Sequence, residues 1–167
     1  MSTLELSMDD WRATVRRSLD DLALRSLGTQ VALTDGEAPG HPWAAWVPLM
    51  SVHDSLRLGL LANPEGCQQL ARTFVGDEAE LTESEVGDAL GEILNILAGC
   101  VKRDVADRLP GLRIGLPIFL PHSTGGPVQA GNTRTAGGQS VETDVTWLRV
   151  SDVLTGLILV RYHHEGG

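Results

Sequence analysis

The segment from Thr82 to Pro110 constrains the fold most, because it predicts one long amphipathic helix with marked ends. The letters "TESE" at residues 82–85 have the spacing of a capping box, which satisfies free backbone N–H groups where a helix begins. Pro110 stops a helix, so we expect the helix at about residues 83–108. Apolar residues recur at three- and four-residue steps along it, at Val86, Leu90, Ile93, Leu97 and Val101. Such a stripe packs against a second layer of structure.

The opposite face of this helix is polar and carries a glycine. It consists of Asp88, Glu92, Asn95, Gly99 and Lys102. A glycine inside a helix costs about 1 kcal/mol relative to alanine, so we expect Gly99 to let another surface approach closely. Gly87, Gly91 and Ala98 form a strip of small residues beside it, which we expect to serve the same purpose. The alternative is a solvated face without a function, which is the commoner meaning of charged helix faces.

Shorter elements are expected on both sides of the long helix. A first helix at about residues 9–27 is capped by Asp9 or Asp10 and ends near Gly28. Two antiparallel strands and a short helix follow, and three strands come after the long helix. Residues 122–140 are rich in Gly, Ser and Thr, which predicts a flexible loop or an open hairpin end. We therefore expect one α/β (α+β) domain over residues 1–167, with a mainly antiparallel sheet packed against long helices.

Composition narrows the classes of partner and the location. The formal net charge is −9, with 22 acidic residues against 13 Lys and Arg, which argues against nucleic acid or an anionic membrane as a partner. The sequence has no signal-peptide pattern and no apolar run near the roughly 20 residues that span a bilayer. The expected location is the cytoplasm. Cys67 and Cys100 lie in apolar, helix-like surroundings, and we expect both to be buried, reduced thiols.

The stretch "ALGEILNILAGCVKRDV" resembles the signature helix of the CheX/CheC/FliY family of chemotaxis phosphatases. That signature is an Asp or Ser, three residues, Glu, two residues, Asn, and a Pro a little over twenty residues later. Asp88, Glu92 and Asn95 match its first three places, and Pro117 is the nearest match to the last, one residue closer than usual. The similarity covers about residues 55–160. A single copy of the signature favours a CheX-like protein over CheC-like members with two sites.

The resemblance implies a reaction and a partner. Family members hydrolyse the aspartyl phosphate of a CheY-like receiver domain. By resemblance, Asn95 would orient the attacking water and Glu92 would pair with the receiver's active-site lysine, so these two are the expected catalytic residues. Asp88, Gly99 and Lys102 share their face and are expected to contact the partner. The receiver would hold Mg²⁺, and no metal or other cofactor is expected in this chain. The family's tendency to dimerise through its sheet suggests a homodimer.

Two other functions stay open from the sequence. One is a non-catalytic adaptor of the same fold that binds a receiver, and the other is a small ligand-binding or dimerising module from outside the family. Glu92 and Asn95 together favour the phosphatase, since an adaptor has no need of the amide. The sequence has no G-x-S-x-G motif and no phosphate-binding loop with its lysine, so hydrolase and nucleotide-binding classes built on those motifs are not indicated.

Overall fold

The computed structural model describes residues 6–52, 54–122, 130–134 and 138–163. Its helices are α1 (Met8–Leu22), a π-helical continuation η1 (Ala23–Leu27), α2 (Pro64–Val75) and α3 (Glu83–Asp104). Its strands are β1 (Val31–Leu33), β2 (Trp43–Met50), β3 (Ser55–Ala62), β4 (Arg113–Ile114), β5 (Ile118–Leu120), β6 (Gly131–Arg134), β7 (Ser140–Val150) and β8 (Val153–His163).

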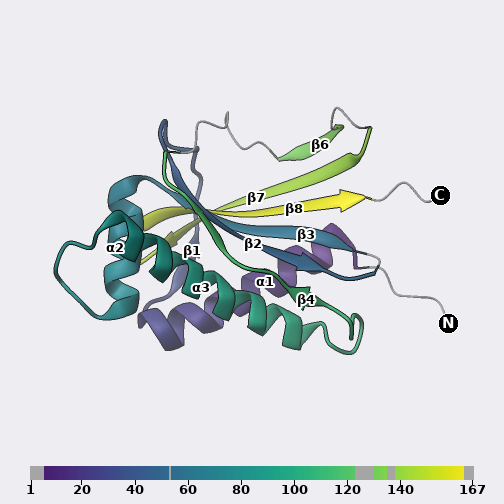
Figure 1. Cartoon of the computed structure of the whole chain (residues 1–167), viewed down its shortest axis with the longest axis horizontal. Coiled ribbons are helices and arrows are strands. Elements are labelled where there is room, and N and C mark those ends of the chain that lie inside the picture. Colours follow the sequence, from purple (N-terminus) through teal and green to yellow (C-terminus); the bar gives the residue numbers. More distant parts are fainter. Residues whose placement is uncertain (1–5, 53, 123–129, 135–137, 164–167) are drawn as a thin grey trace.

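The strands form one antiparallel sheet. Its order is β1-β7-β8-β3-β2-β4, while β5 also pairs with β2 and β6 also pairs with β7. Helices α1, α2 and α3 lie on one side of this sheet (Figure 1). The prediction of an α/β fold with a mainly antiparallel sheet packed against helices is confirmed.

The main core lies between the sheet and the helices. Alternate strand residues such as Val47, Leu58 and Leu157 point into it, as the two-residue period of a strand requires. The predicted apolar stripe of α3 is also buried there. Its members, Val86, Leu90, Ile93, Leu97 and Val101, are each at most 2% exposed. The opposite sheet face, which we call the open face, carries a smaller cluster around Ala44, Leu61 and Ile158.

Helix α3 begins as predicted and ends earlier. The Thr82 backbone N–H donates to Glu85 Oε2 at 2.7 Å, and the Glu85 N–H donates to Thr82 Oγ1 at 3.3 Å. The Thr82 N–H and, at 2.8 Å, the Thr82 hydroxyl both donate to the Glu85 carboxylate, and these two bonds hold the pKa of Glu85 below its ordinary value. The helix ends at Asp104 rather than at about residue 108, because the following residues form a turn in which the Leu109 N–H donates to the Val105 carbonyl at 2.7 Å.

The start of α1 corrects a prediction. Ser7, not Asp9 or Asp10, is the N-cap, because the Ser7 side chain accepts from the Asp10 N–H. Asp10 occupies the third helical position of the same capping box, where its carboxylate accepts from the Ser7 N–H at 3.0 Å. The predicted end is confirmed: Gly28 follows η1 with a φ of 62°, which glycine adopts without strain.

The glycine-rich segment is partly a strand. Residues 131–134 form β6, which pairs antiparallel with the first residues of β7, so this part matches the hairpin end and not the loop among the two forms predicted for residues 122–140. The remainder of the prediction falls largely on residues 123–129 and 135–137, which lie outside the described residues.

The two cysteines differ. Cys67 is 2% exposed, and burial raises the pKa of its thiol to about 12. Cys100 is only partly buried, which contradicts the prediction for this residue, since it lies on α3 at the border between the core and the polar face. Both are free thiols.

Candidate functional site

Helix α3 presents its predicted polar face to solvent. Asp88, Glu92 and Lys102 are exposed, while Asn95 and Gly99 are partly buried. Within the described part of the chain, the Glu92 and Asn95 side chains make no hydrogen bond or ion pair. Their polar groups are therefore available to a partner.

A bulge in the edge of the sheet brings a second segment to this helix. Trp46 pairs with Ile118 whereas Leu49 pairs with Ile114, so two residues of β2 face three residues between β4 and β5. One extra residue on one strand is a β-bulge. It lies opposite Pro48, which has no N–H to donate, while the Pro48 carbonyl accepts from the Gly115 N–H at 2.9 Å. The bulge separates β4 from β5 and includes Pro117.

Pro117 and β5 pack directly on the glycines of α3. A Cβ at Gly91 would lie 3.3 Å from Pro117 Cγ, and a Cβ at Gly87 would lie 2.6 Å from Phe119 Cδ1. These two glycines accommodate this chain's own β5 segment, so the prediction that they leave room for a partner is wrong. A Cβ at Gly99 would meet nothing within 4 Å. Space for a partner at Gly99 stays a prediction.

The contact leaves a hollow of about 310 Å³ between the helix and the strand. We call it the α3–β5 hollow. It is lined by Ser84, Gly87, Asp88, Gly91, Glu92, Asn95, Pro117 and Phe119. The structure thus brings together all four residues that match the signature, while Gly99 and Lys102 lie further along α3 and do not line the hollow.

Sequence reasoning missed Ser84 and Phe119 as members of this site. A signal for Phe119 existed in the spacing, because Gly87 and Gly91 are one helical turn apart and Pro117 and Phe119 are two residues apart. The two glycines on one face of the helix therefore match the spacing of the Pro117 and Phe119 rings, which pack on them.

The Phe119 side of the hollow packs against further aromatic residues. The Phe119 ring meets the Trp43 ring edge-on at a centroid distance of 5.6 Å, and Trp43 meets His122 at 5.8 Å. His122 Nε2 lies 3.5 Å from Glu83 Oε2 at the start of α3. These contacts join the end of β5 to the first turn of the helix, and they fix one wall against the other.

The acidic residues of α3 fall into two groups. Glu85 belongs to the capping box and Glu83 faces His122, and both lie in the first turn, where the helix dipole stabilises negative charge. Asp88 and Glu92 lie beyond the first turn, and no ion pair within the described ranges includes either one. The helix therefore carries two carboxylates at the hollow that its own fold does not use.

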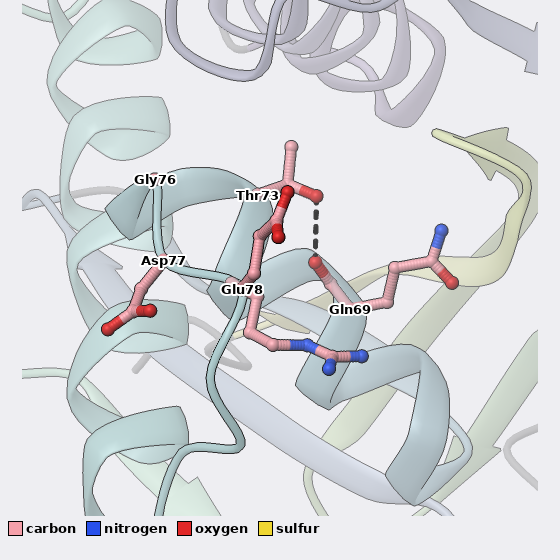
Figure 2. Close-up of a pocket in the computed structure, with 6 residues that line it drawn as sticks. Gln69, Thr73, Gly76, Asp77 and Glu78 are labelled. Carbon is pink, nitrogen blue, oxygen red and sulfur yellow. Dashed lines mark hydrogen bonds between the residues drawn. The ribbon is translucent and has the colours of Figure 1, made fainter.

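A larger hollow of about 420 Å³ lies at the end of α2 and is shown in Figure 2. It is lined by Gln69, Arg72, Thr73, Gly76, Asp77 and Glu78. Thr73 Oγ1 donates to the Gln69 carbonyl at 2.8 Å, a bond inside the helix, and the side chains of Gln69 and Asp77 point in different directions (Figure 2). The Gln69 and Asp77 side chains therefore do not converge on one point, as the polar groups of a catalytic site do.

The described residues show neither a metal cluster nor a membrane-spanning helix. In the part of the chain that the structure describes, no three His, Cys, Asp or Glu side chains come together where they could hold a metal ion. No described helix is long and apolar enough to cross a membrane.

Comparison with known proteins links this geometry to a family. The family model described as "Chemotaxis phosphatase CheX" matches residues 45–134, which include α3 and the α3–β5 hollow. No curated protein sequence matches the chain.

Solved structures share the fold at low sequence identity. The chemotaxis protein CheX of Vibrio vulnificus superposes with a TM-score of 0.69 at 11% identity, covering 92% of this chain and 97% of that one. A chain of the CheX–CheY–BeF3–Mg²⁺ complex from Borrelia burgdorferi superposes with a TM-score of 0.63 at 12% identity, covering 96% of this chain and 100% of that one. FliY of Thermotoga maritima superposes with a TM-score of 0.61 at 13% identity, covering 93% of this chain and 87% of that one. At these identities the likeness concerns the fold.

Proposed function

This chain belongs to the CheX family of chemotaxis phosphatases, and we propose that it hydrolyses the aspartyl phosphate of a CheY-like receiver domain. One observation carries the proposal: Glu92 and Asn95 line the same hollow on a solvent-facing helix and have no partner within the described chain. A relative of the same fold is known in a complex with CheY. A receiver partner also implies that the chain works in the cytoplasm.

The chemistry needs little from the phosphatase. An acyl phosphate has a carboxylate leaving group, so the main requirement is a water molecule held in line with the phosphorus. The Asn95 amide carbonyl accepts a hydrogen bond from that water without carrying charge. The water oxygen bonds to phosphorus, the bond from phosphorus to the aspartyl oxygen breaks, and the water's proton leaves with phosphate or solvent. Free carboxylate and inorganic phosphate result.

Glu92 supplies the contact that positions the two proteins. Its exposed carboxylate pairs with the receiver's active-site lysine, a charge-assisted interaction that fixes register across the interface. The receiver holds the Mg²⁺ ion that the reaction requires. Asp88, Gly99 and Lys102 extend the contact surface along the same face of α3.

The test is loss of phosphate from a panel of phosphorylated receivers with and without the protein. We expect acceleration by the wild-type protein and its loss in Asn95→Ala and Glu92→Ala. The control Glu65→Ala changes an exposed acidic residue on α2, away from the hollow, and should behave as wild type. Unchanged decay across the panel contradicts the proposal. Binding without acceleration identifies the adaptor instead.

We also propose that the protein is a homodimer that uses the open face of the sheet. Ile118 and Leu120 are 57% and 45% exposed, and with Trp46 and Val160 they border an apolar hollow of about 270 Å³. Exposed apolar groups gathered in this way mark association sites. Light scattering should give the mass of two chains for wild type and of one chain for Ile118→Glu. A wild-type monomer at micromolar concentration contradicts the dimer.

A further inference from the structure

The α3–β5 hollow has more features than a water-positioning site needs. One wall is apolar and consists of Pro117, which packs on Gly91, and Phe119, which packs on Gly87. Asp88 of α3 also lines the hollow. A long side chain with an aliphatic stem and a cationic end matches this combination, because Lys and Arg cover apolar surface with their methylene groups while the charge stays at a polar edge.

Asp88 is exposed and has no cationic partner among the described residues. No ion pair within the described ranges involves it, and Glu92 lies one turn further on, about 6 Å along the helix axis. Like charges at this spacing repel each other. The proposed function assigns the receiver's active-site lysine to Glu92, which leaves the second carboxylate uncompensated. Two carboxylates one turn apart have room for two cations.

The position of the hollow indicates where that cation comes from. The hollow adjoins Glu92 and Asn95 on the same face, so a receiver seated on these residues covers it. This chain carries a net charge of −9, which favours basic groups on the partner's surface.

We propose that the α3–β5 hollow binds one further basic side chain of the receiver, with its stem against Phe119 and its cation at Asp88. The inference rests on the proposed function, because the occupant belongs to the receiver. It assigns the hollow to partner recognition, next to the residues that act on the phosphoryl group.

The first test removes the charge and keeps the shape. Asp88→Asn should raise the KM for phosphorylated receiver, and the Kd for receiver loaded with BeF3⁻ and Mg²⁺, by about tenfold at low salt. The value of kcat should stay within about twofold, since the contact is equal in ground and transition states. The effect should shrink at about 1 M salt. Asp107→Asn removes an exposed acidic residue outside the hollow and should leave KM unchanged.

The second test fills the hollow. Ser84 is exposed in the first turn of α3 and lines the hollow, so Ser84→Phe places a ring there without entering the core. It should raise KM by about tenfold or more while the thermal unfolding midpoint stays near that of wild type. Lys and Arg residues of the receiver are then replaced singly by Ala. One of these replacements should raise KM with the wild-type protein but cause no further rise with Asp88→Asn, because the two residues form one contact.

Three results overturn the inference. Unchanged KM in both Asp88→Asn and Ser84→Phe, while Asn95→Ala still abolishes hydrolysis, refutes the second contact and leaves the phosphatase standing. An effect of Asp88→Asn without one of Ser84→Phe shows that charge acts at long range and that nothing enters the hollow. If wild-type protein neither binds nor dephosphorylates any receiver, the proposed function fails and this inference fails with it.

Discussion

Alanine at each of three glycines in α3 separates intrinsic helix propensity from packing. Glycine to alanine in a helix interior stabilises by about 1 kcal/mol when the methyl group has room. At Gly99 an added Cβ meets nothing within 4 Å, so Gly99→Ala should gain 0.5 to about 1 kcal/mol of unfolding free energy. For a chain of this size that gain raises the unfolding midpoint by roughly 1–4 °C.

The other two positions should lose that gain. At Gly87 the new Cβ would lie 2.6 Å from Phe119 Cδ1 and 3.2 Å from its Cβ, and Trp43 holds the ring from the other side. Overpacking of this kind costs about 1–3 kcal/mol, so Gly87→Ala should be destabilised by up to about 2 kcal/mol net. At Gly91 the nearest atom would lie 3.3 Å from the new Cβ, so the free energy of unfolding of Gly91→Ala should fall between those of the other two variants.

Urea unfolding followed by circular dichroism measures this order directly. With equal slopes, the midpoints should rank Gly99→Ala above Gly91→Ala and both above Gly87→Ala. Equal midpoints for the three variants would refute the packing of Pro117 and Phe119 on α3. Gly99→Ala should also weaken binding of the receiver despite its greater stability, because its methyl group occupies the space expected for the partner.

Four further predictions concern charge, thiol reactivity and the cap of α3. Asp88→Asn should raise the free energy of unfolding by about 0.3 kcal/mol at low salt, since it removes a like-charge pair on α3. A thiol reagent at about pH 8 should label Cys100 in the folded protein and spare Cys67, whose thiol has a pKa of about 12 and is buried. Thr82→Ala should cost about 1 kcal/mol by removing the helix cap. The pKa of Glu85 is lower in the folded state than its ordinary value of 4.5. The stability that the Glu85 carboxylate contributes is therefore present above pH 4.5 and is lost as pH falls through the folded-state pKa. The urea midpoints of wild type and Glu85→Gln should differ at neutral pH and converge in acid.

The helix of the site could be predicted from the sequence because its determinants are local. Thr82 and Glu85 announce the capping box, and the 3.6-residue period separates the buried stripe from the face of Glu92 and Asn95. Local signals were ambiguous only at the ends. Asp10 resembles a cap, and its part in a capping box depends on Ser7 three residues earlier.

The strand wall of the site could not be predicted in the same way. Its place depends on β5 pairing with β2, some seventy residues earlier in the chain, and on the bulge opposite Pro48. The glycines of α3 indicated that another segment packs closely on the helix, but they did not indicate which segment. That segment is Pro117 and Phe119 of the same chain, which gives the shifted proline of the signature a position in the hollow.

The most direct test of the account measures binding and hydrolysis in the same Asn95→Ala protein. A receiver loaded with BeF3⁻ and Mg²⁺ gives the Kd, and a single turnover of the phosphorylated receiver at saturating protein gives the rate. The account predicts a Kd close to that of wild type and a rate about 100-fold lower, because only the placement of water is lost. A hydrolysis rate equal to that of wild type would contradict the assignment of Asn95 as the residue that holds the water.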